Sequence, residues 1–358
     1  MNRITFLDGF RGLAILLVIL YHAFARWSSI LPYGDEFSVF PITEGFIGVY
    51  LFFLISGFVI LMTLEKSKNF LEFLLKRWRR LFPAMLISTI FIFFIGQFLP
   101  ERPDGIPKIT NSIPGLIFMD PVWIKRIFHF DTGILESSFW SLYVEVKYYF
   151  IFGILFFSFG KNKAIAVIFG CYFVWLIFRT FQYAGITNFK FLTSVFQTFS
   201  FHYFGWFTSG SLAYLYFKSK NKKYIICSFI SGVFAITTFG LASKSTLLIA
   251  FCILLIFLST VYFENLKRLF SNKFLIFFGF ISYPLYLIHE NTMIALIVKL
   301  NKHFPATPDI LLPVIPISLL VIISYYIATV IEPMIQKNLK KLPYLRPAYA
   351  WRKSRKKD

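Results

Sequence analysis

The sequence is poor in charged residues and in cysteine. Only 15% of its 358 residues are Asp, Glu, Lys or Arg, against about a quarter in soluble globular domains. This shortage argues against a soluble enzyme, as does a mean hydropathy of +0.68. The three cysteines lie in apolar runs without metal-ligand spacing, so we expect neither a metal site nor a disulfide. With 49 Phe and 19 Tyr, the composition predicts a membrane protein with several spans.

Apolar stretches long enough to cross a bilayer recur along the whole chain. They lie at about residues 9–27, 45–64, 81–99, 139–160, 164–178, 194–217, 224–240, 245–263, 274–298 and 311–331, the fifth being short unless it extends to about residue 184. We therefore predict an all-α integral membrane protein, a bundle of about ten transmembrane helices. We expect one transmembrane domain over residues 1–336 and a basic cytoplasmic tail over residues 337–358. The longest connection, at about residues 100–138, is expected to be a periplasmic loop.

The basic residues are distributed unevenly over the expected connections. If the N-terminus is cytoplasmic, 25 of the 37 Lys and Arg face the cytoplasm and 10 lie outside, with Arg11 and Lys147 in the membrane. This bias predicts that the N-terminus and the C-terminus are both cytoplasmic. It also accounts for the net charge of +20 without nucleic acid, and we expect the basic tail to contact anionic membrane lipids.

Three ionisable residues interrupt the first apolar stretch, "FLDGFRGLAILLVILYHAF". Arg11 and His22 are eleven residues apart, which is three helical turns plus roughly 20°, so both lie on one face of a helix. Asp8 precedes Arg11 by three residues and is close enough to pair with it. A structural alternative is that Arg11 snorkels to the cytoplasmic interface and His22 lies in the opposite headgroup region.

The fourth stretch, "SFWSLYVEVKYYF", carries a carboxylate at membrane depth. Ser141 and Glu145 are i,i+4 neighbours on one helix face, one to two turns below the expected outer surface. Charges at this depth are costly and usually face one another or a water-filled cavity. Glu145 is therefore a candidate functional residue.

The ninth stretch, "FGFISYPLYLIHENTM", brings a second histidine to the outer half of the membrane. Tyr283, Tyr286 and His289 recur at i,i+3 spacing along it. We predict that His22, Glu145 and His289 converge on a shared cavity in the outer half. A structural role, in which His289 hydrogen-bonds a tyrosine hydroxyl inside the bundle, is the alternative.

The second expected connection, "KRWRRLFPAML", is cytoplasmic and rich in arginine. Arg77 and Arg80 lie at i,i+3, and Pro83 lies just inside the start of the third span. Guanidinium groups suit phosphates because each donates two parallel hydrogen bonds. Such clusters also serve as topology signals or lipid-headgroup contacts, and both interpretations stay open.

Taken together, these motifs resemble the membrane-bound acyltransferase family 3, whose members move acyl groups onto extracytoplasmic glycans and related hydroxylated molecules. The resemblance covers nearly the whole chain. Its elements, in chain order, are "FLDGFRGLAILLVILYH", "FFLISGFVI", the pair Arg77 and Arg80, "WSLYVE", "ISYPLYLIHE" and "VIEPMI".

The chain departs from the family pattern at several positions. Tyr50 stands where the family often has an acidic residue, and Val146 and Lys147 replace a second acidic residue and a glutamine. Glu290 and Asn291 follow His289 in place of the usual His-x-Pro continuation. These changes leave Arg11, His22 and Glu145 intact and bear on the acceptor.

The resemblance implies an O-acyltransferase of the bacterial inner membrane that uses cytoplasmic acyl-CoA, most simply acetyl-CoA, as its donor substrate. His22 is our candidate general base, since an imidazole has an ordinary pKa near 6.5, and Glu145 would orient it. Arg11, with Arg77 and Arg80, would bind the donor. Ser141, Tyr286, His289 and Asp8 are candidate substrate-binding residues. We expect no metal, no permanently bound cofactor and no nucleic acid.

A second class of function fits the buried charges equally well. In a proton-coupled transporter or flippase, the same charges would relay protons or bind a polar or lipid-linked cargo. The cytoplasmic arginine pair and the ordered motifs favour the acyltransferase. A purely structural, lipid-binding scaffold would leave the aligned polar faces unexplained.

Overall fold

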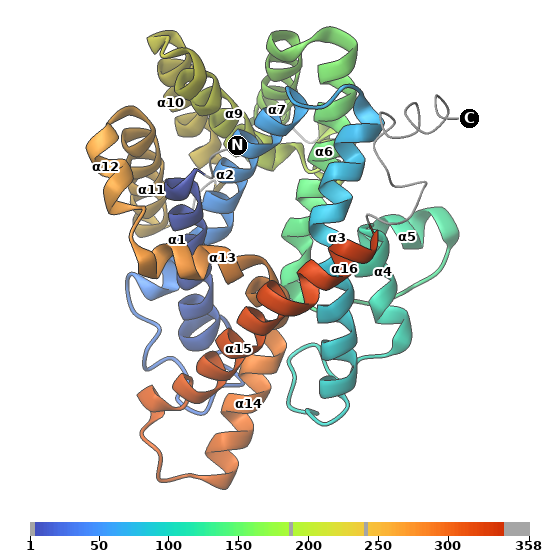
Figure 1. The fold of residues 1–358 in the computed structure, drawn as a ribbon, viewed down its shortest axis with the longest axis vertical. Helices are drawn as coiled ribbons and strands as arrows, with labels where there is room; N and C mark the ends of the chain where they lie inside the picture. Colours follow the sequence, from blue (N-terminus) through green and yellow to red (C-terminus); the bar gives the residue numbers. More distant parts are fainter. Residues whose placement is uncertain (1–3, 186–188, 240–242, 340–358) are drawn as a thin grey trace, which may run out of the picture. The chain divides into compact units, whose positions relative to one another are not determined.

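The computed structural model describes residues 4–185, 189–239 and 243–339, and all regular structure within them is helical (Figure 1). Most of the predicted basic tail, from residue 340 onward, lies outside the described residues. The chain divides into two compact units, Met1–Lys66 with Trp140–Ser282 and Ser67–Phe139 with Tyr283–Asp358. Each unit is described by itself.

The first unit contains most of the long apolar helices. Its helices are α1 (Thr5–Tyr21), α2 (Ile47–Leu64), α6 (Trp140–Phe159), α7 (Lys161–Tyr183), α8 (Lys190–Thr198), α9 (Phe204–Ser219), α10 (Lys222–Ile236), α11 (Lys244–Tyr262) and α12 (Glu264–Leu269), and most of α13 (Lys273–Ile288) belongs to it. A π-helical turn, His22–Arg26, continues α1. The predicted extension of the fifth span is confirmed by α7.

Helix α2 is the core of the first unit and packs against α1, α6, α9 and α11. Its contact with α9 is a backbone contact, because a Cβ added to Gly57 would lie 2.0 Å from the carbonyl oxygen of Phe207, and one on Gly210 1.9 Å from that of Leu54. Small residues permit such approach between membrane helices.

Helix α1 packs in the same way on the segment that includes the start of α13. A Cβ on Gly9 would lie 1.6 Å from the carbonyl oxygen of Phe270, and one on Gly279 would lie 1.8 Å from that of Asp8. The two glycines thus fix the N-terminal half of α1, and with it Asp8, against residues 270–279.

The second unit is built around one long helix. Its helices are α3 (Phe70–Gly96), α4 (Ile113–Ile117), α5 (Pro121–Phe128), α14 (Glu290–His303), α15 (Val314–Tyr326) and α16 (Glu332–Leu339), with a π-helical turn, Ile327–Ile331, joining the last two. Helix α3 contacts α4, α14 and α16. The connection at residues 100–138 contains α4 and α5, and its periplasmic location stays a prediction.

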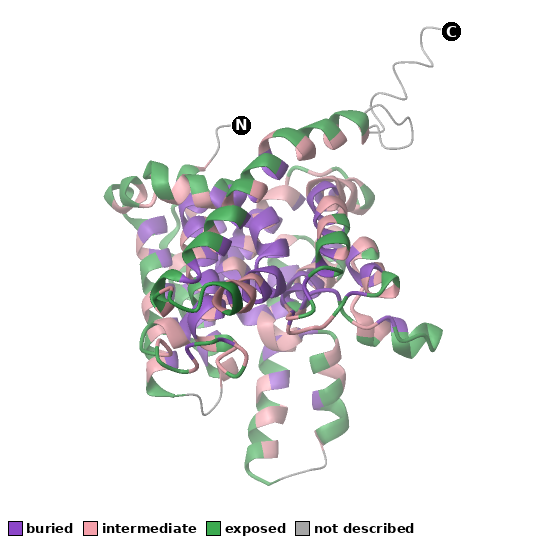
Figure 2. Cartoon of the chain, turned by 90° about the horizontal axis from the view of Figure 1, so that it is seen from below, coloured by how far each residue is buried: buried purple, intermediate pink, exposed green. Residues whose placement is uncertain are grey.

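Eight helices among the described residues are long and apolar enough to cross a membrane, and α13 is a shorter apolar helix. Large apolar side chains such as Phe94, Ile154 and Ile322 are exposed, which suits contact with lipid. Figure 2 shows that exposed residues recur along the helices of both units. The count of ten spans and the cytoplasmic location of both termini stay predictions.

Two of the predicted continuous spans are interrupted. The sixth, 194–217, is divided between α8 and α9 at Ser200, whose φ of 64° takes the backbone out of the helix. The ninth, 274–298, is divided at His289 into α13 and α14. There the backbone N–H of Asn291 donates to Glu136 Oε2 at 3.1 Å. In a regular helix this N–H would donate to the backbone carbonyl oxygen four residues earlier.

Candidate active site

The acidic and basic residues of α1 form the predicted pair. Arg11 Nη1 donates to Asp8 Oδ1 at 3.0 Å, and the two side chains are 17% and 9% exposed. Both belong to one continuous helix, because α1 runs without interruption from Thr5 to Tyr21. A paired, largely buried guanidinium costs less to hold in the bilayer than an isolated charge.

His22 stands where α1 changes from an α-helix to a π-helical turn, a feature frequently found at functional sites. Its ring Nδ1 lies 2.8 Å from the carbonyl oxygen of Val18, and its exposure is 9%. A carbonyl can only accept, so Nδ1 carries a proton. In the neutral ring, Nε2 is then the atom with the lone pair, as a general base requires.

Glu145 on α6 is held by two hydroxyl groups. Ser56 Oγ on α2 donates to its Oε1 at 2.9 Å, and the Tyr149 hydroxyl donates to the same oxygen at 2.5 Å. Sequence reasoning proposed Ser141 as the polar neighbour of Glu145 and missed these two donors. Tyr149 follows Glu145 by four residues, so helical spacing could have identified it. No sequence spacing links Ser56 to Glu145, because the two residues are 89 positions apart on different helices.

Two of the three helices that carry the predicted cavity residues pack against the same neighbour, α2. Helix α2 packs against both α1 and α6, the helices of His22 and Glu145, within the first unit. His289 belongs to the second unit. The meeting of the three side chains in one cavity therefore stays a prediction.

The arginine motif lies within a helix, so the prediction of a loop ahead of a span at residues 81–99 is wrong. Helix α3 begins at Phe70, because the Asn69 side chain accepts the backbone N–H of Glu72 at 2.9 Å and Glu72 Oε2 accepts that of Lys68 at 2.9 Å. Pro83 is accommodated inside α3 instead of starting it.

The helical setting separates the two arginines of the motif. Arg80 lines a cavity of about 220 Å³ together with Lys76, Arg79, Gln336 and Leu339, the last two from α16. Lys76, Arg79 and Arg80 follow i, i+3, i+4 spacing and share one face. Arg77 is 5% exposed and is not among the lining residues.

Three cations line this cavity, and two of them have a carboxylate nearby. Lys76 pairs with Glu72 at 2.9 Å, and Glu332 is within electrostatic reach of Arg80. Arg79 adds a third cation that sequence reasoning missed. Guanidinium and ammonium groups around a small cavity can bind the oxygens of a phosphate.

The tyrosines of α13 are anchored to neighbouring backbone. The Tyr283 hydroxyl donates to the carbonyl oxygen of Leu81 at 3.1 Å, and the Tyr286 hydroxyl donates to that of Ser138 at 2.9 Å. His289, which is fully buried, places Nδ1 2.8 Å from the backbone carbonyl oxygen of Tyr286. In these two hydrogen bonds the tyrosine hydroxyls donate to backbone carbonyl oxygens and not to His289. They therefore do not support the alternative in which His289 hydrogen-bonds a tyrosine hydroxyl.

A buried polar network follows His289 and was not predicted. Asn291 Nδ2 donates to Glu136 Oε2 at 2.6 Å and to Asp104 Oδ2 at 2.8 Å. Arg102 Nη2 pairs with Glu136 Oε1 at 3.1 Å, with both side chains at most 1% exposed. Burial raises the pKa of Glu136 to about 8, although the charge of Arg102 opposes the rise. The network joins the break at His289 to both ends of the connection between α3 and α6.

Comparisons with known proteins identify the family of the chain. The model of the acyltransferase family 3, described as an acyltransferase domain, matches residues 4–332. A Staphylococcus aureus (strain COL) protein named as a candidate O-acetyltransferase is 28% identical over 325 residues, which cover 81% of this chain and 50% of that protein. No solved structure matches the chain.

Two further relatives have more specific names. The peptidoglycan O-acetyltransferase OatA of Listeria monocytogenes is 27% identical over 44% of this chain and 25% of its own length, and the O-acetyl transferase of Shigella phage Sf6 is 30% identical over 47% and 50%. The chain spans about half the length of the Staphylococcus aureus relative. With the family model matching residues 4–332, the chain belongs to the acyltransferase family 3.

Proposed function

We propose that the protein transfers an acyl group, most simply acetyl, from cytoplasmic acyl-CoA to a hydroxyl of an extracytoplasmic glycan or a related acceptor. Membership of the acyltransferase family and relatives named as O-acetyltransferases support the reaction class. The apolar helices support a multi-pass membrane protein, and we propose the bacterial inner membrane as its location.

The observation that carries the proposal is the hydrogen bond between His22 Nδ1 and the Val18 carbonyl oxygen at 2.8 Å. It directs the basic lone pair to Nε2. In the proposed reaction, Nε2 takes the proton of the acceptor hydroxyl while the hydroxyl oxygen attacks the thioester carbonyl. The carbon–sulfur bond then breaks, and the coenzyme A thiolate receives the proton from the imidazolium.

Glu145 is the proposed partner of that imidazolium. A carboxylate beside the base stabilises the cation that forms during proton transfer. Two hydroxyl donors on Oε1, from Ser56 and Tyr149, restrict the carboxylate to one orientation. Asp8 holds Arg11 at 3.0 Å, and we assign Arg11 to the polar part of the donor.

The cationic cavity of the second unit is the proposed site for the phosphates of acyl-CoA. Lys76, Arg79 and Arg80 supply the positive charge, and Arg77 contributes from the adjacent face. Tyr286, His289 and Ser141 are assigned to substrate binding. The partners proposed are acyl-CoA, a hydroxylated acceptor and membrane lipids, with no nucleic acid.

The test uses membranes that contain the full chain, acetyl-CoA and cell-envelope glycans, with release of free thiol as the readout. His22→Ala and Glu145→Gln should each reduce acceptor-dependent release by at least about 100-fold, the scale of general base catalysis. Tyr149→Phe should cause a smaller loss, since Ser56 still donates.

A matched control is available in this chain. His303 Nδ1 also contacts a carbonyl four residues earlier, that of Lys299 at 2.8 Å, but its side chain is exposed. His303→Ala should leave release unchanged. Full turnover in His22→Ala would refute the assignment, and transport that depends on a proton gradient but not on coenzyme A would replace it with a transporter.

A further inference from the structure

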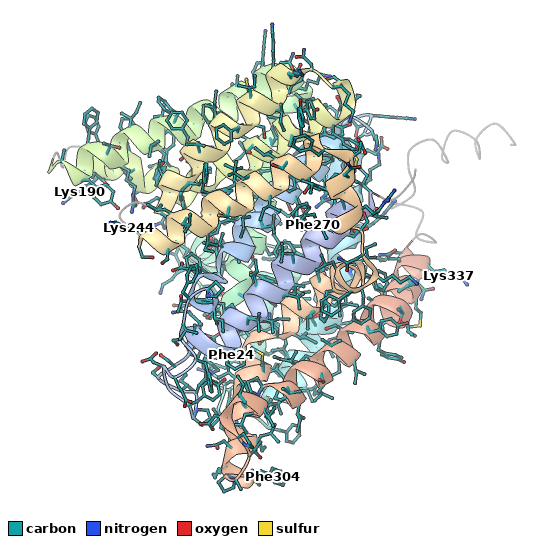
Figure 3. The ribbon with its side chains drawn as sticks, turned by 90° about the vertical axis from the view of Figure 1, so that its left-hand side faces the viewer. Phe24, Lys190, Lys244, Phe270, Phe304 and Lys337 are labelled. Carbon is teal, nitrogen blue, oxygen red and sulfur yellow. The ribbon has the colours of Figure 1, made fainter. Side chains whose placement is uncertain are left out.

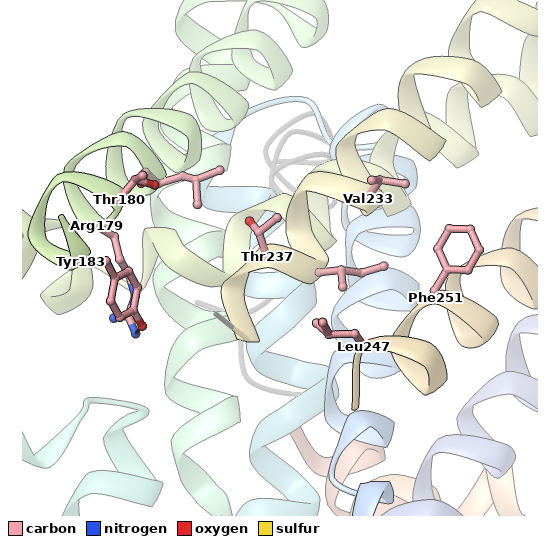
Figure 4. Close-up of a pocket in the computed structure, with 9 residues that line it drawn as sticks. Arg179, Thr180, Tyr183, Val233, Thr237, Leu247 and Phe251 are labelled. Atoms are coloured by element: carbon pink, nitrogen blue, oxygen red, sulfur yellow. Dashed lines mark hydrogen bonds between the residues drawn. The ribbon is translucent and has the colours of Figure 1, made fainter. Parts of the chain in front are cut away.

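An apolar cavity of about 540 Å³ lies between α7, α10 and α11 of the first unit, a volume typical of small-molecule sites. Its lining includes Leu176 from α7, Ile236 from α10, and Leu247 and Phe251 from α11. In Figure 4, Arg179 and Tyr183 form one wall, opposite the residues of α10 and α11. The cavity involves none of the residues assigned to acyl transfer.

Arg179 is the one charged residue among those that line the cavity. Its Nη2 donates to the Tyr183 hydroxyl at 2.7 Å, and its guanidinium lies over the rings of Tyr183 and Trp175, 5.1 and 5.5 Å from their centroids. Among the described residues, no ion pair includes Arg179. These contacts hold the guanidinium in place and leave several of its five N–H donors for a ligand.

Two threonines line the cavity with Arg179, and the hydroxyl groups of both are already hydrogen-bonded. Thr180 Oγ1 donates to the carbonyl oxygen of Leu176 at 2.9 Å, and Thr237 Oγ1 donates to that of Phe234. Glu44, from the 3-10 turn Ile42–Glu44 that contacts α11, accepts from the hydroxyls of Ser245 and Thr246 at 2.7 Å each. The chain thus supplies no anion to Arg179 from these groups.

Further basic residues lie at the same end of the helices. Lys190 begins α8, just after α7, and Lys244 begins α11, one turn before Leu247. Figure 3 shows both lysines at the same end of the helices of the first unit. Under the topology expected from the charge bias, this end is external. Arg179, Lys190 and Lys244 are then three of the ten basic residues expected outside. A ligand for this cavity must combine an apolar chain with an anionic head.

We propose that the cavity binds an anionic phospholipid, with an acyl chain against Leu247 and Phe251 and the phosphate on Arg179. An alkyl chain matches the apolar walls, and a planar guanidinium matches a phosphate bidentately. This proposal is independent of the acyl-transfer reaction.

The test measures lipid retention by the full-length protein in detergent micelles. Phosphatidylglycerol and phosphatidylcholine with identical acyl chains are supplied together, and bound lipid is counted by native mass spectrometry. Arg179→Gln should reduce phosphatidylglycerol retention by about tenfold, the scale of charge-assisted hydrogen bonds. Lys302→Gln removes the same charge from an exposed site on α14 and should have no effect.

A second variant tests the apolar part separately. Leu247→Trp fills the cavity without changing charge and should also reduce retention, while Arg179→Lys should keep part of the preference for phosphatidylglycerol. Unchanged retention in Arg179→Gln, or an equal loss in Lys302→Gln, would overturn the proposal. So would competition by free glycerol phosphate with no loss in Leu247→Trp, because that would indicate an anion site and not a lipid site.

Discussion

The buried ion pair of the second unit offers a direct test of how burial governs the strength of charge interactions. Arg102 Nη2 lies 3.1 Å from Glu136 Oε1, and Nη2 also donates to the carbonyl oxygen of Leu135 at 2.7 Å. At pH 9, above the pKa of Glu136, Arg102→Met removes the cation and leaves a buried carboxylate. We expect a loss of about 3–5 kcal/mol in the free energy of unfolding, typical of a broken buried pair.

A second ion pair in the same connection provides the control. Lys125 Nζ and Asp131 Oδ2 are closer, at 2.6 Å, but their side chains are 65% and 63% exposed. Lys125→Met should cause no measurable change, because water screens the pair. Unfolding by dodecyl sulfate in mixed micelles, followed by circular dichroism, measures both variants. If Arg102→Met is no less stable than Lys125→Met, burial does not strengthen the pair and the reasoning fails.

The destabilisation caused by Arg102→Met should also depend on pH, in a direction that the pKa of Glu136 predicts. Burial raises the pKa of Glu136 to about 8, well above its value in an unfolded chain, so its favourable contribution is complete below about pH 4.5 and is lost as the pH rises through 8. Without Arg102 the pKa rises further. Arg102→Met should therefore be more destabilising at pH 9 than at pH 6, and adding Glu136→Gln should recover part of the loss, since Gln is neutral and still accepts from Asn291. The opposite pH trend would contradict the buried charge.

Two further predictions concern the first unit. Partial burial favours a higher pKa for Glu65, but hydrogen bonds from Lys218, Tyr214 and Lys161 outweigh it and lower the pKa. Its stabilising contribution is therefore present above about pH 4.5 and lost as the pH falls, so Glu65→Gln should flatten the acid side of the stability–pH curve; an unchanged acid side would refute this. Gly279→Ala should lower the free energy of unfolding by about 1–3 kcal/mol, because the added Cβ would lie 1.8 Å from the carbonyl oxygen of Asp8. Gly170→Ala, with no atom within 4 Å, should be neutral or slightly stabilising, and equal thermal stability of the two alanine variants would contradict this close packing.

Several features of the candidate site could be predicted because they depend on positions close together in the chain. The Asp8–Arg11 pair is an i,i+3 contact, which helical geometry alone determines. The ordered motifs identified the family, which the family model confirms. The roles of His22 and Glu145 in catalysis stay predictions.

Other features of the site depend on contacts between distant residues and left no local signal. Ser56 meets Glu145 across 89 positions, and Asn291 meets Glu136 across 155. The latter contact also ends the helix at His289, which the apolar pattern alone presents as continuous. The N-cap at Asn69 starts α3 at Phe70, before the predicted start at residue 81, so the arginines lie on a helix.

Hydropathy and helical periodicity are properties of neighbouring residues, so the all-helical membrane character, the Asp8–Arg11 pair and the family could be predicted from the chain alone. The hydroxyls that hold Glu145, the breaks in two helices and the cations that share a cavity depend on the packing of the helices. Those outcomes depend on buried polar groups finding partners on other helices, and which partner comes within reach is settled by how the helices pack.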